Sequence, residues 1–250
     1  EGGILICNFG TEQLNPLNNE GKGYINYYKD GKLNVLIAAD GNLSAPKGMF
    51  TKDNYLFICD VNKIMVYNLK ALKETPQTIF FPEDDLFIND LAADGNTLYA
   101  SVTNSGKIYQ IDITNPSNMS DITPIKWVDI IGPNGLIIDN GIMYVASYPA
   151  DGTTTDANVI YQITDFANPV VEKFTILPGQ YDGIALSADK KTMYITNWSP
   201  AGISCINMST RQITPLMIKE DLTGPADITV INDTIYIPDL PNSRMIIQPL

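Results

Sequence analysis

The sequence predicts an all-β fold, a six-bladed β-propeller with four antiparallel strands in each blade. One phrase recurs along the chain: a polar residue opens an apolar run, a turn follows, and an aromatic strand ends in a small residue. The aromatic anchors of five copies are 42, 45, 50 and 42 residues apart, a period typical of propeller blades. No segment has the pattern of a long helix. The anchors are Phe57, Tyr99, Tyr144, Tyr194 and Tyr236.

Each repeat contains four short apolar segments separated by turn signals rich in Gly, Asn and Pro. In the third repeat, we expect strands at residues 90–93, 98–102, 107–112 and 124–130. These segments are apolar at nearly every position, so both faces of each small sheet must be covered. Packing of blades face to face provides that cover.

The repeats predict a single domain over residues 1–250, with blades at about 4–37, 46–81, 88–131, 133–177, 181–218 and 225–250. The first blade opens on the equivalent of a second strand, and the last blade stops after its third strand. The two end blades are therefore expected to be incomplete. Because a missing inner strand leaves backbone groups unpaired, we expect the natural chain to continue upstream and supply the missing strands.

The composition excludes several function classes. The net charge of −12 disfavours nucleic acid as a partner, and no apolar run is long enough for a membrane span. The absence of histidine excludes Ser-His-Asp and Cys-His catalysis and every histidine-ligated metal. The three cysteines are expected to be unpaired thiols, and the protein a monomer. A secreted or periplasmic location is favoured over a cytoplasmic one, although the sequence does not settle the compartment.

The polar residues that open the inner strands are candidates for a functional site, because inner strands of a propeller begin at one face. Amide and carboxylate oxygens from successive blades suit a hard cation such as Ca²⁺ or Mg²⁺. Asn and Asp are also favoured wherever a chain turns into a strand, and this structural interpretation stays open beside the functional one. The opening residues are Lys47, Asn89, Asn134, Asp182 and Ala226, and Lys47 is also a candidate substrate contact.

Second strands end at the same face, where Asn197 and Trp198 are candidate substrate contacts; Trp198 is alternatively a packing residue. Asp60 and Asp239 lie at equivalent positions but are interpreted as structural. The segment that begins at Asp239 is similar to the Asp-x-x-Asn-x-Arg turn of NHL-type repeats, where Asp and Asn fix the turn. The long polar loops 9–23 and 149–158 are expected over this face and are candidate functional insertions.

The chain resembles the SMP-30/gluconolactonase/LRE-like (SGL) six-bladed propellers, with NHL-like repeats in blades two and six. Asn89 lies in a segment similar to the family's Arg-x-Asn-Asp, whose Asn contacts substrate. Asn134 corresponds to the metal-ligating Asn of Ser-Asn-Gly-Leu. Asp182 corresponds to the Asp of Pro-Asp-Gly, a metal ligand and the proposed base. Phe87 replaces the family's substrate-contacting Arg, and the inner strand that carries the family's metal-binding Glu is absent from this sequence.

Two functions follow as hypotheses. In the first, the resemblance implies a metal-dependent hydrolase of a lactone or related ester. Asn134 and Asp182 would hold a divalent cation, with calcium as the expected ion and Mg²⁺, Mn²⁺ or Zn²⁺ as alternatives. Asp182 would act as base, and Asn89 would orient the substrate. In the second, the propeller is non-catalytic and binds a glycan, peptide or protein on its loop face. There, a Lys47–Asp182 ion pair would take the place of the metal.

Overall fold

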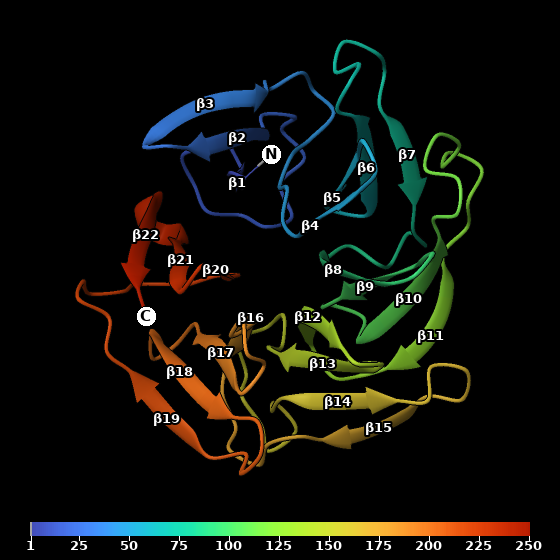
Figure 1. Cartoon of the computed structure of the whole chain (residues 1–250). Helices are drawn as coiled ribbons and strands as arrows, with labels where there is room; N and C mark the ends of the chain where they lie inside the picture. The colour runs from blue at the N-terminus through green and yellow to red at the C-terminus, as the bar shows by residue number, and fades with distance from the viewer. Residues whose placement is uncertain (1) are drawn as a thin grey trace. The chain divides into compact units, whose positions relative to one another are not determined.

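The computed structural model describes residues 2–250 and is built almost entirely of β-strands (Figure 1). In the described residues, the strands form six antiparallel sheets, four with four strands and two with three. The three-stranded sheets are the first and the last, as expected from the incomplete end repeats. This arrangement confirms the predicted fold class, a six-bladed β-propeller. In residues 2–250, no helix is long and apolar enough to cross a membrane.

The residues group into two compact units, and the boundary between them falls inside the third sheet. The first unit extends to Ser105 and includes Tyr109–Lys126. The sheets that begin in it are formed by β1 (Ile4–Asn8), β2 (Tyr24–Lys29) and β3 (Lys32–Ile37); by β4 (Met49–Lys52), β5 (Tyr55–Cys59), β6 (Lys63–Asn68) and β7 (Gln77–Phe80); and by β8 (Ile88–Asp94), β9 (Thr97–Val102), β10 (Lys107–Asp112) and β11 (Ile125–Asp129).

The second unit comprises Gly106–Ile108 and Trp127–Leu250 and contains the last three sheets. A short 3₁₀ turn, η1 (Leu240–Asn242), precedes its final strand. The sheets are formed by β12 (Pro133–Asp139), β13 (Ile142–Ser147), β14 (Tyr161–Thr164) and β15 (Val170–Lys173); by β16 (Tyr181–Leu186), β17 (Thr192–Asn197), β18 (Gly202–Asn207) and β19 (Ile213–Leu216); and by β20 (Thr229–Ile231), β21 (Thr234–Asp239) and β22 (Arg244–Pro249).

Local sequence explains where the strands turn. Asp30-Gly31 and Asn140-Gly141 join neighbouring strands with positive φ at both positions, the backbone that a tight two-residue hairpin requires. Asn232 and Asp233 do the same between β20 and β21. The strands expected in the third repeat agree with β8–β11 to within two residues at each end. Turn chemistry and apolar runs were therefore enough to locate these elements.

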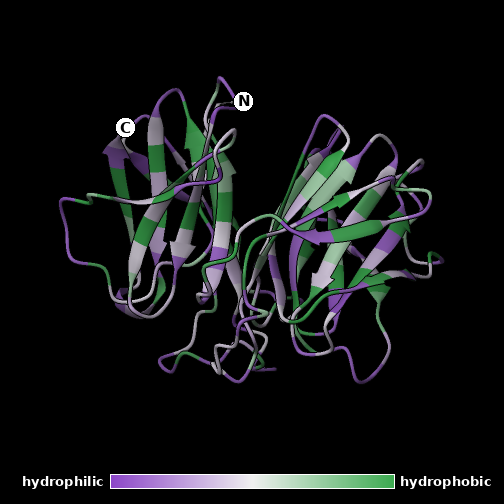
Figure 2. Ribbon diagram, turned by 90° about the horizontal axis from the view of Figure 1, so that it is seen from below, coloured by the Kyte–Doolittle hydropathy of each residue, from purple (hydrophilic) through white to green (hydrophobic). Residues whose placement is uncertain are grey.

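The sheets enclose apolar cores on both faces, as the continuous apolar runs predicted. Figure 2 shows hydrophobic colour concentrated on the strands and hydrophilic colour on many of the connecting loops. Four of the aromatic anchors are buried, whereas Tyr236 is half-buried. The three cysteines form no disulfide with one another, as expected, with Cys59 buried and the other two half-buried. The buried anchors are Phe57, Tyr99, Tyr144 and Tyr194.

The recurrent phrase coincides with an irregularity in the inner strands. Pairing of the first two strands shifts register between Ile88 and Leu91 in the third sheet. Equivalent shifts lie between Pro133 and Leu136 in the fourth sheet and between Tyr181 and Ile184 in the fifth. Such shifts leave backbone groups unpaired and redirect side chains. Asn89, Asn134 and Asp182 all lie inside these irregular segments.

Small polar residues near the end of the second strand compensate for the lost backbone pairing. The Asp90 N–H donates to Ser101 Oγ at 3.0 Å, and the Gly183 N–H donates to Thr196 Oγ1 at 2.6 Å. Both hydroxyl residues are buried, so an unpaired N–H there would be costly. The small polar residue that closes the recurrent phrase therefore accepts a backbone N–H that the irregular inner strand beside it leaves unpaired.

The glycine of the phrase allows adjacent inner strands to approach closely. A Cβ on Gly183 would lie 2.5 Å from Asp227 Cα and 2.7 Å from the Ile228 nitrogen. A Cβ on Gly135 would lie 2.6 Å from the Asp182 carbonyl oxygen. These are backbone atoms, which cannot move aside as a flexible side chain could. Glycine is therefore required by contact between sheets of the second unit.

We expect Gly183→Ala to destabilise the protein by about 1–3 kcal/mol, the usual cost of overpacking. Equilibrium urea denaturation would measure it as a lower midpoint with an unchanged slope. Gly202→Ala is the matched control, because a Cβ on Gly202 would meet nothing within 4 Å. Equal midpoints for the two variants would contradict the close-approach explanation.

Candidate functional site

The candidate site of the second unit lies where the first strands of its three sheets come together. Within this unit, β12, β16 and β20 are neighbours (Figure 1). Asn134 on β12 is buried, and its Nδ2 donates to Asp182 Oδ2 on β16 at 3.3 Å. Asp227, just before β20, accepts the backbone N–H of Ile228 at 2.9 Å and also that of Ile184. Two carboxylates and one amide thus gather from three successive sheets.

Both carboxyl groups bind protons more tightly than ordinary aspartates. Burial, followed by the negative charge of Asp227, raises the pKa of Asp182 to about 7, against the lowering effect of the Asn134 hydrogen bond. Burial also raises the pKa of Asp227 to about 6, although the backbone hydrogen bonds oppose this. Asp182 is only half-buried and Asp227 is exposed. Solvent therefore screens both carboxylates, and each pKa shift corresponds to a smaller free-energy difference than it would for a fully buried group.

These residues fit a hard divalent cation. Two neighbouring carboxylates that repel each other are stabilised by a positive charge between them. The Asn134 amide would contribute its oxygen, which requires the amide to turn from the orientation in which Nδ2 faces Asp182. In the part of the chain described, no group of three or more His, Cys, Asp or Glu side chains is placed so that it could hold a metal ion by itself. Substrate or water oxygens would therefore complete the coordination.

Aromatic side chains lie near this acidic group. Tyr148, which follows β13, stacks on Trp198, which follows β17, with centroids 6.3 Å apart and ring planes at 29°. Burial and then the charge of Asp182 raise the pKa of Tyr148, which indicates that its hydroxyl lies near this carboxylate. Both rings are half-buried. Trp198 therefore packs against a ring and also remains available as the predicted substrate contact.

Asn197 has a structural role that the sequence did not reveal. Its Oδ1 accepts the Gln180 N–H at 2.7 Å, and its Nδ2 donates to the Pro200 carbonyl oxygen at 2.7 Å. Both ends of the amide are thus engaged in holding the segments on either side of β17. Its predicted contact with substrate stays a prediction.

Lys47 and Asn89, the remaining predicted substrate contacts, lie in the first unit. Their segments are adjacent, because the Gly48 N–H donates to the Asn89 carbonyl oxygen at 2.7 Å. Asn89 Nδ2 donates to Thr103 Oγ1 at 3.0 Å. Lys47 Nζ donates to the Ala45 carbonyl oxygen at 2.9 Å and lies 5.1 Å from the ring centroid of Phe87. The predicted substrate role of both residues stays a prediction.

The structural interpretation of Asp60 and Asp239 is confirmed. Asp60 is fully buried and accepts the backbone N–H groups of Ser44 and Ala45 at 3.1 and 2.7 Å. Asp239 is also fully buried and accepts hydrogen bonds from Asn242 at 2.8 Å and Arg244 at 2.9 Å. The Asp-x-x-Asn-x-Arg pattern therefore fixes the turn between β21 and β22.

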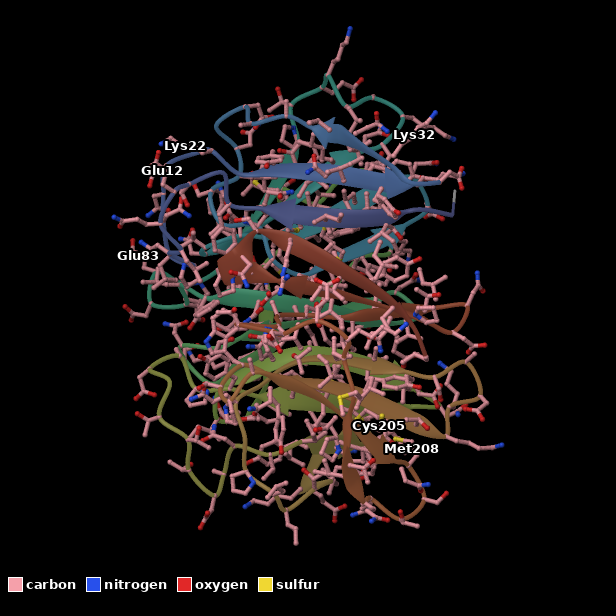
Figure 3. All side chains as sticks on the ribbon, turned by 90° about the vertical axis from the view of Figure 1, so that its left-hand side faces the viewer. Glu12, Lys22, Lys32, Glu83, Cys205 and Met208 are labelled. Atoms are coloured by element: carbon pink, nitrogen blue, oxygen red, sulfur yellow. The ribbon has the colours of Figure 1, made fainter. Side chains whose placement is uncertain are left out.

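The two long loops are held by their own polar contacts. In loop 9–23, Asn18 is buried and donates to the Ser44 carbonyl oxygen at 3.2 Å, while Glu12 and Lys22 project near each other (Figure 3). In loop 149–158, Asn158 is fully buried and donates to Ser147 Oγ at 3.1 Å. Gln180 Nε2 donates to the Gly152 carbonyl oxygen at 2.8 Å, which joins the second loop to the segment before β16.

Asp227 is not among the residues predicted from the sequence, because the repeat pattern places the neighbouring Ala226, not Asp227, at the opening of the inner strand. A signal was present: Asp227 aligns with Gly135 and Gly183, so an acidic residue replaces the glycine of the phrase. Asp90 makes the same replacement in the third repeat and is buried there. Only the close approach of β16 and β20 shows that Asp227 faces Asp182.

No protein-family model matches the chain, and no curated protein matches it. Solved structures do share its fold. A chain of a nidogen–laminin complex is 15% identical with a TM-score of 0.72, covering 92% of this chain and 86% of that one. Virginiamycin B lyase from Staphylococcus aureus is 18% identical with a TM-score of 0.58, covering 82% and 70%. A gluconolactonase from Xanthomonas campestris is 12% identical with a TM-score of 0.61, covering 82% and 75%.

Proposed function

We propose that this protein is a divalent-cation-dependent hydrolase of a lactone or related ester, acting at Asn134, Asp182 and Asp227. The observation that supports the proposal most directly is the pairing of Asp182 with the Asn134 amide at 3.3 Å, next to a second carboxylate. The likeness in fold to a gluconolactonase is a further support. Calcium is the expected cation, with Mg²⁺, Mn²⁺ and Zn²⁺ as alternatives.

A divalent cation, when bound, supplies polarisation of the ester carbonyl and a more acidic water. Asp182 acts as the general base and takes a proton from water while the water oxygen bonds to the carbonyl carbon. The ester C–O bond then breaks, and the proton passes to the departing alkoxide to give a hydroxy acid. Asn134 orients the Asp182 carboxylate, and Asp227 adds negative charge that favours cation binding.

Calcium is expected to stabilise the folded protein, because it binds the carboxylate pair in the native state only. At a concentration 100 times the dissociation constant, the gain is about 2.7 kcal/mol. Thermal unfolding with CaCl₂ or with EDTA measures it. The shift should vanish in Asp182→Asn and persist in Asp189→Asn, whose carboxylate is exposed. No shift with any of the four cations at millimolar concentration would contradict the proposed cation site.

A non-catalytic binding protein is the second candidate. The stacked pair Tyr148–Trp198 favours it, because half-buried aromatic rings that keep part of their surface accessible suit sugars and peptides. The likeness to a chain from a nidogen–laminin complex also favours it. The two candidates differ in one measurement. Asp182→Asn would eliminate turnover of a lactone panel in a hydrolase, whereas a binding protein would show no turnover even as wild type.

A further inference from the structure

Two aromatic residues of the second unit occupy equivalent positions, each directly after the second strand of its sheet. Tyr148 follows β13, and its N–H donates at 2.8 Å to the carbonyl oxygen of the residue two positions before Asn134. Trp198 follows β17, and its N–H donates at 2.8 Å to the carbonyl oxygen of the residue two positions before Asp182. Backbone pairing therefore holds each aromatic residue beside the strand that carries a residue of the proposed site.

Tyr148 and Trp198 together form what we call the aromatic shelf. Their ring centroids are 6.3 Å apart, and the ring planes make an angle of 29°. Because atoms in contact lie about 3.5–4.0 Å apart, a spacing of this size means that the rings are displaced sideways, and each leaves part of its face uncovered by the other. Both side chains are half-buried, so the shelf keeps accessible surface.

A glycine in the last sheet makes room for the shelf. A Cβ on Gly224 would lie 2.8 Å from Cη2 of Trp198 and 2.8 Å from Cγ and Cδ of Pro241, which lies between β21 and β22. Trp198 and Pro241 therefore both lie next to Gly224. Apolar surface thus comes from Tyr148, Trp198 and Pro241, that is, from the same three sheets that supply the proposed site.

The polar groups next to the shelf are already engaged within the protein. The Asn197 amide accepts the Gln180 N–H at 2.7 Å and donates to the Pro200 carbonyl oxygen at 2.7 Å. Gln180 Nε2 donates to the Gly152 carbonyl oxygen at 2.8 Å. Hydroxyl groups of a sugar would have to compete with these hydrogen bonds, whereas a planar apolar ring needs only the faces of the shelf.

We propose that the site selects lactones and esters that carry an aromatic ring, and that this ring stacks on the shelf while the ester carbonyl reaches Asp182. This substrate class rests on the hydrolase proposed above. Dihydrocoumarin, a lactone fused to a benzene ring, is the test substrate. In its hydrolysis the water oxygen bonds to the carbonyl carbon, the lactone C–O bond breaks, and the proton that Asp182 takes from water passes to the phenolate oxygen.

A comparison of two lactones in saturating calcium tests the proposal. Trp198→Ala should lower kcat/KM for dihydrocoumarin about 10-fold more than kcat/KM for δ-valerolactone, which has the lactone ring without the benzene ring. Trp198→Phe, which keeps an aromatic ring, should restore most of this difference. Trp127→Phe is the matched control, since the Trp127 indole is also half-buried but donates to the Phe166 carbonyl oxygen. Equal losses for the two lactones would mean that Trp198 only supports the fold, and would overturn the proposal.

Tryptophan fluorescence tests the shelf without turnover. The chain has two tryptophans, so Trp127→Phe leaves Trp198 as the only indole. When Trp127→Phe is combined with Asp182→Asn, millimolar dihydrocoumarin should change the Trp198 emission, whereas δ-valerolactone should not. An emission unchanged by dihydrocoumarin would overturn the proposed substrate class even if the wild type hydrolyses lactones. A changed emission, together with no turnover of any lactone by the wild type, would contradict the hydrolase and support stacking of an aromatic ligand on the shelf.

Discussion

Asp182→Asn is expected to lower kcat/KM for lactone hydrolysis by about 10²–10⁴-fold, the usual contribution of a general base. The amide cannot accept the proton from water, and it removes one of the two charges that attract a cation. A lactone panel assayed with saturating calcium measures the loss. Asp189→Asn, an exposed change in the same sheet region, should retain wild-type rates.

The same substitution should stabilise the protein when no cation is bound. The pKa of Asp182 is raised to about 7 in the folded state, so ionisation of this group opposes folding as pH rises from about 4 to 7. Removing the charge should therefore raise stability at pH 8 by on the order of 1 kcal/mol, after allowance for the partial exposure of the group. The difference should vanish below pH 4, where the carboxyl is protonated in both states.

With calcium bound, wild type should be more stable than Asp182→Asn, because only the wild-type site gains binding energy from the cation. Thermal unfolding at pH 8, measured in EDTA and in calcium, therefore distinguishes the binding of calcium by Asp182 from the destabilising effect of its charge when no cation is bound. A variant that lost activity and was also less stable in EDTA would instead indicate that Asp182 supports the fold.

Asp239→Ala is expected to destabilise the protein by about 3–5 kcal/mol, because it leaves Arg244 and several N–H donors without their buried partner. Asp239 accepts the N–H groups of Thr223 and Gly224, each at 2.9 Å, as well as Asn242 and Arg244. Urea denaturation measures the loss. Glu172→Ala, at an exposed position on β15, should change stability by less than about 0.5 kcal/mol.

The effect of Asp239 should depend on pH in a defined direction. Burial alone would raise its pKa, but hydrogen bonds from Gly224, Asn242, Thr223 and Arg244 outweigh burial and lower it to about 2. The ionised group therefore contributes stability above about pH 4, and about 2 kcal/mol of it is lost as pH falls to 2. The gap between wild type and Asp239→Ala should narrow over that range. A constant gap would mean that packing, not charge, carries the effect.

The sequence by itself determined the fold class, the six repeats and most strand positions. These features depend on local chemistry. A continuous apolar run indicates a strand whose two faces are both buried, and an Asn-Gly or Asp-Gly pair favours a tight two-residue turn. The role of Asp239 was also predictable, because its partners Asn242 and Arg244 lie within five residues of it. Asn134 and Asp182 were identified as candidates because they occupy equivalent positions in the repeat.

Only the tertiary structure decided which residues meet. Asp227 faces Asp182 because glycine at position 183 lets two inner strands approach to a distance that no Cβ would allow. The supporting roles of Ser101 and Thr196 depend on backbone irregularities between strands. Burial lowers the pKa of Lys47 to about 8, and the rings of Phe9 and Phe87, 38 and 40 residues away in sequence, lie close to its Nζ. Such effects come from distances between residues remote in sequence, and a local pattern does not contain them.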